Sequence, residues 1–383
     1  NARRTVRWKN ESVHIVPLPA RGLSALGISS LAPNLVLEVP QSSRLVEIKP
    51  YVVGGVATDL ATQPPTRNDA TADYGVDVKY GLTQNLTADF TYNTDFAQVE
   101  ADEQQVNLTR FSLFFPEKRE FFLENAGTFS FGGAATNANA GAGDTPILFY
   151  SRRIGLNDAR MVPLRGGARV TGRAGKFVIG AANMETGEDT VGKLDATNFT
   201  VVRVKRDVLR NSAIGLIATN RSVSQVSKGQ NQTYGVDGTF TFGPTLIINS
   251  YWAKTEHAGR GSDNQSYRGQ LVYAGDRYGA QLEQLSVGRD FAPDVGFVRR
   301  TDIRRSYAQF RFSPRPTFTR RIRKFSYTGS FTYVQNGSGR VENRQSDGEF
   351  AIEFQNADRL AVYAAQIYEF VPRPFRVASC TKG

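Results

Sequence analysis

Apolar and polar side chains alternate along most of the chain between residues 46 and 370, so that every second residue is apolar. In the clearest stretch Phe325, Tyr327 and Phe331 stand on one side of a predicted strand, with Ser326 and Thr328 on the other. Residues 74–80, 86–92 and 234–242 repeat the pattern. This period of two predicts antiparallel β-strands with one apolar and one polar face. The apolar face is rich in Phe and Tyr, whereas the core of a soluble sandwich is usually filled by Val, Ile and Leu.

The connections between the predicted strands alternate in length. Short turns are expected at 82–85, 172–176, 206–212, 242–246, 274–278 and 355–359, and longer polar segments at 186–197, 220–232, 255–264, 288–302 and 336–346. Strands of about ten residues joined in this rhythm are typical of an outer-membrane β-barrel. Residues 313–324 fit least well, because the segment is long where the rhythm predicts a short turn.

The predicted fold is all-β, an antiparallel transmembrane β-barrel. We count roughly fifteen candidate strands from near Val46 to near Phe370, and single-chain bacterial barrels have even strand numbers. We therefore expect 14–18 strands, with 16 as the best value and at least one closing strand missing. Residues 1–45 are expected to form a linker or periplasmic extension, and 46–383 the barrel. Both ends of the sequence look processed or incomplete, because Asn1 is not an initiator Met and the last residues lack a strand pattern.

The amino-acid composition excludes several other classes of protein. A single Cys excludes a disulfide framework, and no run of eighteen or more apolar residues predicts a membrane-spanning helix. The 47 Lys and Arg against 36 Asp and Glu give a net charge of +11, but the basic residues are scattered. The remaining alternative is a soluble all-β protein such as a propeller, and no repeat of about forty residues supports it.

One long connection, residues 94–146, interrupts the strand rhythm. Its first half is aromatic and charged, and a stretch rich in Gly, Ala and Asn follows at 132–143. Rings at this density must be buried, and the barrel interior or an extracellular cap offers the place. We predict that 94–146 plugs, constricts or caps the lumen, through Phe111, Phe114, Phe115, Glu117, Lys118, Arg119, Phe121, Phe122 and Glu124.

Three stretches of the sequence resemble the DUF5916 family. They are residues 93–124, which include NTDFAQVEADEQQVNLTRFSLFFPEKREFFLE, residues 290–302, DFAPDVGFVRRTD, and residues 368–375, YEFVPRPF. Residues 3–11 are similar to the family's linker. The resemblance implies a bacterial outer-membrane β-barrel, which in this family commonly follows a family-9-like carbohydrate-binding domain. That domain has no counterpart in this sequence, and the resemblance supplies no established activity.

We expect no enzyme and no cofactor. His14 and His257 are the only histidines, and neither has a partner spaced as in a zinc site or catalytic triad. Cys380 stands alone near the end of the chain. A carbohydrate-binding or glycan-processing protein remains the alternative from another class, because paired carboxylates leave no spacing rule in a β-fold.

A Ca²⁺ site is the one metal site that we consider. Asp95, Glu100 and Asp102 lie in an acidic cluster with Asp89 and Glu103, and carboxylate oxygens are the ligands that Ca²⁺ prefers. The cluster lacks the spacing of an EF-hand loop. An ordinary polar lumen wall, or a salt-bridge network with Lys118 and Arg119, is the alternative.

The densest basic runs are expected at the rim of the barrel, where they would contact lipid or lipopolysaccharide. They contain Arg299, Arg300, Arg304, Arg305, Arg321 and Arg323. No nucleic-acid partner is expected, since no stacking platform accompanies these residues. The sequence thus predicts a bacterial outer-membrane pore, translocation component or membrane anchor that contacts other outer-membrane or periplasmic proteins. A non-conducting structural subunit is the alternative.

Overall fold

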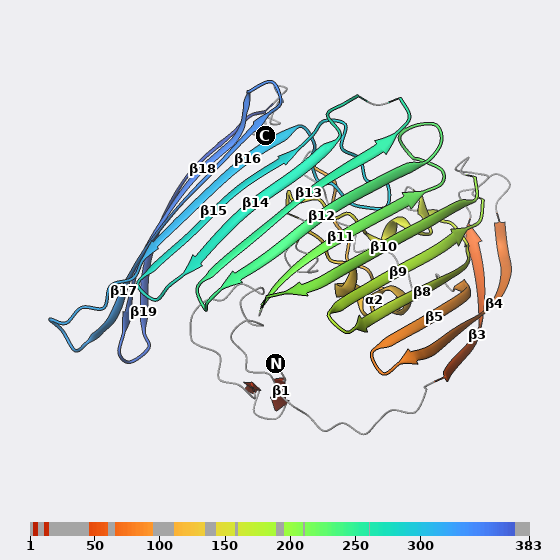
Figure 1. Ribbon diagram of the computed structural model, residues 1–383, viewed down its shortest axis with the longest axis horizontal. Helices are drawn as coiled ribbons and strands as arrows, with labels where there is room; N and C mark the ends of the chain where they lie inside the picture. Colours follow the sequence, from red (N-terminus) through yellow and green to blue (C-terminus); the bar gives the residue numbers. More distant parts are fainter. Residues whose placement is uncertain are drawn as a thin grey trace, which may run out of the picture.

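A single curved antiparallel sheet of 15 strands dominates the fold (Figure 1). The computed structural model describes residues 3–6, 11–14, 46–59, 66–94, 111–134, 143–157, 160–188, 195–209, 211–259 and 261–371. Within these residues no helix is long and apolar enough to cross a membrane. The predicted all-β antiparallel architecture is confirmed, and the strand number lies within the expected range, one below the best value.

Sequence neighbours pair throughout the sheet. In order its strands are β3 (Val46–Asp59), β4 (Thr66–Thr83), β5 (Leu86–Thr94), β8 (Leu164–Ala174), β9 (Phe177–Thr186), β10 (Thr197–Val208), β11 (Ser212–Arg221), β12 (Asn231–Phe242), β13 (Leu246–His257), β14 (Gln265–Ala274), β15 (Tyr278–Val287), β16 (Ile303–Phe312), β17 (Ile322–Asn336), β18 (Val341–Phe354) and β19 (Arg359–Glu369). This meander is what alternating short and long connections predict.

The two edges of the sheet are β3 and β19, and within the described residues these strands do not pair with each other. Within the described residues the sheet is therefore open. In a separate two-stranded sheet, β1 (Arg3–Val6) pairs with β2 (Glu11–His14), where the sequence predicted a linker. Both histidines end strands, His14 in β2 and His257 in β13.

Two connections differ from the predicted rhythm. Residues 337–340 form a short turn between β17 and β18, because β18 begins at Val341, well before the predicted start after Ser346. The connection 313–321 between β16 and β17 is shorter than predicted, because β17 begins at Ile322. It nevertheless remains longer than the other turns at its end of the sheet.

We call the segment between β5 and β8, residues 95–163, the insertion. Its described residues, 111–134, 143–157 and 160–163, lie inside the curve of the sheet (Figure 1). Its described part has little regular structure. It contains α2 (Glu120–Leu123), the 3₁₀ helices Ala126–Phe129 and Ser151–Arg153, and the short pair β6 (Leu156–Asn157) and β7 (Arg160–Met161). The insertion leaves and rejoins the sheet at the end that carries the long connections.

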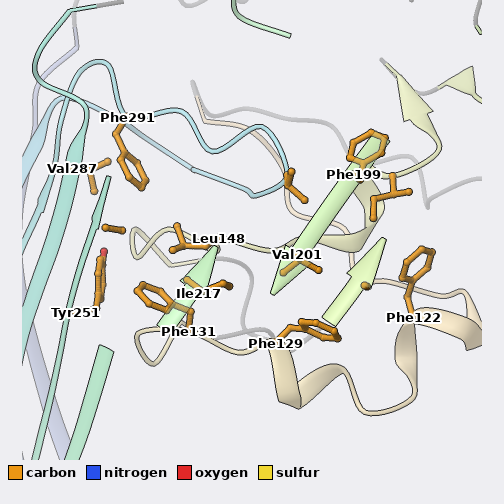
Figure 2. Packing of buried hydrophobic residues seen from close by; sticks show 14 of the residues in the cluster. Phe122, Phe129, Phe131, Leu148, Phe199, Val201, Ile217, Tyr251, Val287 and Phe291 are labelled. Atoms are coloured by element: carbon orange, nitrogen blue, oxygen red, sulfur yellow. The ribbon is translucent and has the colours of Figure 1, made fainter. Parts of the chain in front are cut away.

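The main hydrophobic core lies between the insertion and the inner face of the sheet (Figure 2). We call the inner face of the 15-stranded sheet the wall. Phe129, Phe131 and Leu148 from the insertion are buried with Val201 of β10 and Ile217 of β11 from the wall. Leu148 and Ile154 show that the packed segment continues beyond residue 146, the predicted end of the plug. Burial of these rings removes a large apolar area from water and holds the insertion in place.

Candidate functional site

The insertion is organised around one buried ion pair. Arg119, whose side chain is 3% exposed, donates through Nε and Nη2 to the two carboxylate oxygens of Glu117 at 2.8 and 2.7 Å. It also donates to the carbonyl oxygens of Ser151 and Ile154, each at 2.8 Å. The Ser151 hydroxyl donates to Glu117 at 2.6 Å. This bidentate pair links residues 117–119 to residues 151–154, two parts of the insertion that are far apart in sequence.

The contacts of Glu117 with Arg119 and Ser151 set the pKa of its carboxyl. Burial alone would raise the pKa of the Glu117 carboxyl, but the hydrogen bonds and charge of Arg119 and the Ser151 hydrogen bond outweigh burial and hold it below the ordinary value of 4.5. Glu117 is therefore ionised at neutral pH. It acts as a structural anion rather than as a proton donor.

A second link is formed next to the first. Arg152 donates to the Pro116 carbonyl at 2.9 Å, and the Tyr150 hydroxyl donates to the Phe115 carbonyl. The Arg152 guanidinium also lies 5.9 Å from the centre of the Phe115 ring. The segment Pro116–Arg119 is thus held mainly by residues 150–154.

The insertion meets the long connection between β15 and β16, residues 288–302. Ile147 and Phe297 form an isolated β-bridge with N···O distances of 2.9 and 2.7 Å. The ring of Phe297 contacts Phe114 and Tyr150, with centroid distances of 5.4 and 5.7 Å. A Cβ on Gly296 would lie 2.3 Å from the Ile147 carbonyl oxygen, so glycine permits this close approach. The two long motifs identified in the sequence are therefore in direct contact.

Three groups of charged side chains on the inner face of the sheet bind the backbone of the insertion. The first group lies on β5 and β8. Arg169 of β8 pairs with Asp89 of β5 at 2.8 Å. Its Nη1 donates to the carbonyl oxygens of Phe121 and of Glu124, the latter at 2.8 Å. The Glu124 carboxylate accepts a hydrogen bond from Lys79 of β4. Asp89, part of the acidic cluster considered for Ca²⁺, is thus neutralised by an arginine.

The second wall pair joins β10 to β12. Arg203 is 1% exposed and binds both oxygens of Asp237, at 2.7 and 2.8 Å. Arg203 also donates to the Ser130 carbonyl at 3.1 Å, and Asp237 accepts the backbone N–H of Gly132 at 3.0 Å. Both members of the pair therefore hold the same turn of the insertion.

The third wall group holds the other side of this turn. Arg268 of β14 binds Glu283 of β15 at 2.6 Å and donates to the Gly132 carbonyl at 2.9 Å. Arg305 of β16 also donates to Glu283, at 3.1 Å. Gly132 has φ +59°, and a Cβ there would lie 2.5 Å from the Tyr251 ring, so the turn requires glycine.

Glycines in the wall make room for the aromatic side chains of the insertion. A Cβ on Gly180 of β9 would lie 2.9 Å from the Phe129 ring. A Cβ on Gly235 of β12 would lie 2.6 Å from the Phe131 ring. The wall and the insertion are therefore complementary in shape as well as in charge.

Most of the predicted plug residues lie in this docked part. Phe122 is buried, Phe114 and Phe121 are partly buried, and Lys118 is exposed. Phe111 lies under the guanidinium groups of Arg299 and Arg300, 5.1 and 4.8 Å from the ring centre. That contact was not predicted.

The predicted rim arginines occupy different environments. Arg304, Arg321 and Arg323 are exposed. The Arg300 side chain is 9% exposed and lies 3.9 Å from Glu342, and Arg305 faces the inner side of the sheet. Lipid contact by these residues stays a prediction.

The predicted Ca²⁺ ligands Asp95, Glu100 and Asp102 lie outside the described residues. Within the part of the chain that is described, no group of three or more His, Cys, Asp or Glu side chains is arranged to hold a metal ion.

The wall residues Arg169, Arg203, Asp237, Arg268 and Glu283 were not singled out from the sequence. The alternation along each strand is the signal that could have pointed to them. Each is a charged residue on the buried strand face, two positions before or after a buried residue. Arg203, for example, follows Phe199 and Val201 on the same face of β10.

A comparison with models of protein families finds a match for part of the chain. Residues 42–176 match the family model "Domain of unknown function (DUF5916)". The resemblance to this family is confirmed over that stretch, which contains strands β3, β4, β5 and β8 and the whole of the insertion. No curated protein matches the sequence.

Several solved structures are similar at low sequence identity. Pseudomonas aeruginosa OccK8 (OprE) is 11% identical, with 86% of this chain and 85% of that chain covered and a TM-score of 0.37. Pseudomonas aeruginosa OccK10 (OpdN) is 12% identical, with 86% of each chain covered and a TM-score of 0.35. A structure described as a bacterial polysaccharide outer membrane secretin is 11% identical, covering 85% of this chain and 99% of that chain with a TM-score of 0.33.

Proposed function

We propose that this protein is a bacterial outer-membrane β-barrel whose insertion restricts passage through the lumen. The observation that carries the proposal is the contrast between the two faces of the sheet. The outer face carries exposed apolar side chains in continuous cross-strand rows, such as Leu216, Val236, Trp252 and Tyr267. The inner face of the same sheet carries the buried ion pairs that hold the insertion.

A sheet with this polarity is suited to lipid on the outside and to polar or protein groups on the inside. Alternate residues of a transmembrane β-strand face lipid and lumen, and those that face lipid are apolar. In water, an exposed apolar surface of this extent would favour aggregation. The rows of apolar side chains on the outer face therefore support a membrane location. Together with the charged side chains on the inner face, they support a barrel.

The insertion supports a restricted pore. Its contacts reach β4, β8, β10, β12 and β14 and the connection before β16, so it spans much of the inner face. We propose that it blocks a large part of the cross-section and that displacement of the docked turn at 128–134 widens the passage.

Planar-bilayer conductance tests the proposal, after heat-modifiable gel migration has established that the barrel is folded. The variant Arg203→Gln/Arg268→Gln removes two wall anchors, and Arg173→Gln is the control, since Arg173 pairs with Asp207 at a solvent-exposed site. We expect stable small steps for the protein and the control, and larger or more frequent openings for the double variant. Deletion of 111–124 should increase conductance further.

A folded barrel whose conductance responds to neither change would overturn the restricted pore. It would favour the second candidate, a non-conducting membrane anchor for other outer-membrane or periplasmic proteins. The extent of the ionic anchoring is the observation that favours this alternative. The carbohydrate-binding or glycan-processing alternative stays a prediction, tested by glycan binding and glycosidase turnover.

A further inference from the structure

A cross-strand row of aromatic side chains crosses the outer face of β15–β18 near the short-turn end. Tyr278 pairs with Phe312, Phe312 with Tyr327, and Tyr327 with Phe350. The ring centroids of these successive pairs lie 5.3, 6.3 and 5.0 Å apart. The rings form a nearly continuous ridge, with the side chain of Val362 of β19 following Phe350 in the register.

The adjacent row, farther from the turns, consists mostly of small residues. Ala280 pairs with Phe310, Phe310 with Gly329, Gly329 with Gly348, and Gly348 with Ala364. A Cβ on Gly348 would meet no atom within 4 Å, so packing inside the protein does not require a glycine there. The small row and the ridge line an apolar groove of about 710 Å³, a volume in the range of ligand pockets, about 300–1,000 Å³.

Positive charge lies at the end of this groove. The guanidinium of Arg277, in the turn before β15, lies 5.7 Å from the Tyr278 ring centre and 5.4 Å from that of Phe312. Arg320 and Arg321 follow in the connection 313–321 at the same end of the sheet. Within the described residues none of these three arginines has an acidic partner, whereas nearby Arg315 and Arg323 are paired with Asp276 and Glu353.

We propose that the groove binds an acyl chain of an anionic glycerophospholipid, with the lipid phosphate at Arg277 and near Arg320 and Arg321. The inference rests on the proposed membrane location. Tyr and Arg are the residues expected at the level of the headgroups, where a ring is half in the apolar phase and a guanidinium meets phosphate. The backbone that forms the floor is already hydrogen-bonded in the sheet, and the side chains of the two rows are apolar. The groove therefore offers an acyl chain mainly apolar contact, and Arg311, Thr328 and Glu349 are its polar lining residues.

Bound lipid is measured directly by native mass spectrometry. The protein is reconstituted into vesicles of phosphatidylcholine with one tenth phosphatidylglycerol, extracted in mild detergent, and the lipids retained per protein are counted. Gly348→Leu fills the groove, and Gly269→Leu is the matched control, because Gly269 lies on the outer face of β14 and a Cβ there also meets no atom within 4 Å. Arg277→Gln/Arg321→Gln removes charge at the groove, and Arg304→Gln removes an exposed arginine at the other end of β16.

We expect the protein and both controls to retain phosphatidylglycerol in excess of its share in the vesicles. Gly348→Leu should reduce retained lipid several-fold. The arginine double variant should retain lipid but lose about tenfold of its preference for phosphatidylglycerol, because each removed charge weakens binding to anionic lipid.

Three results would count against these expectations, and they are distinguishable. A protein that a urea wash removes from the vesicles would overturn the proposed membrane location, and the lipid site with it. A membrane-inserted protein in which Gly348→Leu and Gly269→Leu retain equal amounts of phosphatidylglycerol would overturn the lipid site alone. Loss of a dimer, rather than of lipid, in Gly348→Leu would assign the groove to a second copy of the chain.

Discussion

Replacing Arg203 by glutamine is expected to loosen the insertion without unfolding the sheet. The change removes both hydrogen bonds to Asp237 and the bond to the Ser130 carbonyl, and leaves a carboxylate that is 13% exposed without its cation. Removing one member of a buried ion pair costs about 3–5 kcal/mol. Because Asp237 keeps the Gly132 N–H and is slightly exposed, we expect about 3 kcal/mol, the lower end of this range.

That free energy corresponds to about a 100-fold increase in the population with the turn at 128–134 undocked, at about 1.4 kcal/mol for each factor of ten. Hydrogen exchange followed by mass spectrometry reports this population through the amides of 128–134, in folded protein. Arg173→Gln is the matched control, since its pair with Asp207 is 51% and 42% exposed and is expected to contribute no more than about 1 kcal/mol.

The double variant Arg203→Gln/Asp237→Asn should recover part of the protection, because it removes the unpaired charge. Equal exchange of 128–134 in Arg203→Gln and Arg173→Gln would refute the conclusion that the wall pair anchors the insertion. Faster exchange throughout the sheet would instead assign Arg203 to the stability of the strands.

Three further predictions concern the docking of the insertion. Gly235→Leu places a side chain against the Phe131 ring and should destabilise docking by about 1–3 kcal/mol, measured as faster exchange at 128–134 in a barrel that still shows heat-modifiable migration. Gly296→Val should break the bridge to Ile147 and expose 143–150 to limited proteolysis at neutral pH, whereas unchanged cleavage would mean that the bridge contributes nothing. Because the folded pKa of Glu117 is lowered, its contribution should be complete above pH 4.5 and lost as the pH falls through the folded value. Proteolysis of 111–134 by an acid-active protease should rise over that interval in the protein and lose this acid dependence in Glu117→Gln.

The sequence predicted the sheet well because successive residues of a strand face opposite sides, so that apolar and polar residues alternate along the sequence. The first and last strands, beginning at Val46 and ending at Glu369, lie where the alternation begins and ends. The start of β18 was missed because residues 342–346, ENRQS, contain no apolar side chain and so show no alternation. Pairing with β17 and β19 makes them a strand, which is a property of neighbours distant in sequence.

The site was predicted in part. The segment around Phe114 and Arg119 was recognised because dense rings must be buried, but its partners were not, since Arg203, Asp237, Arg268 and Phe297 are far from it in sequence. Nothing in a local pattern distinguishes an arginine that faces the insertion from one that faces lipid or water. Arg305 illustrates this limit, because it directly follows the exposed Arg304 and yet binds Glu283 on the inner face.

The anchoring of the insertion also has a consequence for the order of folding. Gly132 is held by Asp237 and Arg268, which follow it by 105 and 136 residues, and Arg153 donates to the Gly296 carbonyl 143 residues later. Contacts of such sequence separation form late and slowly. The aromatic segment therefore emerges during synthesis long before β12–β16, which complete its binding surface, and its rings remain without their partners until those strands have assembled.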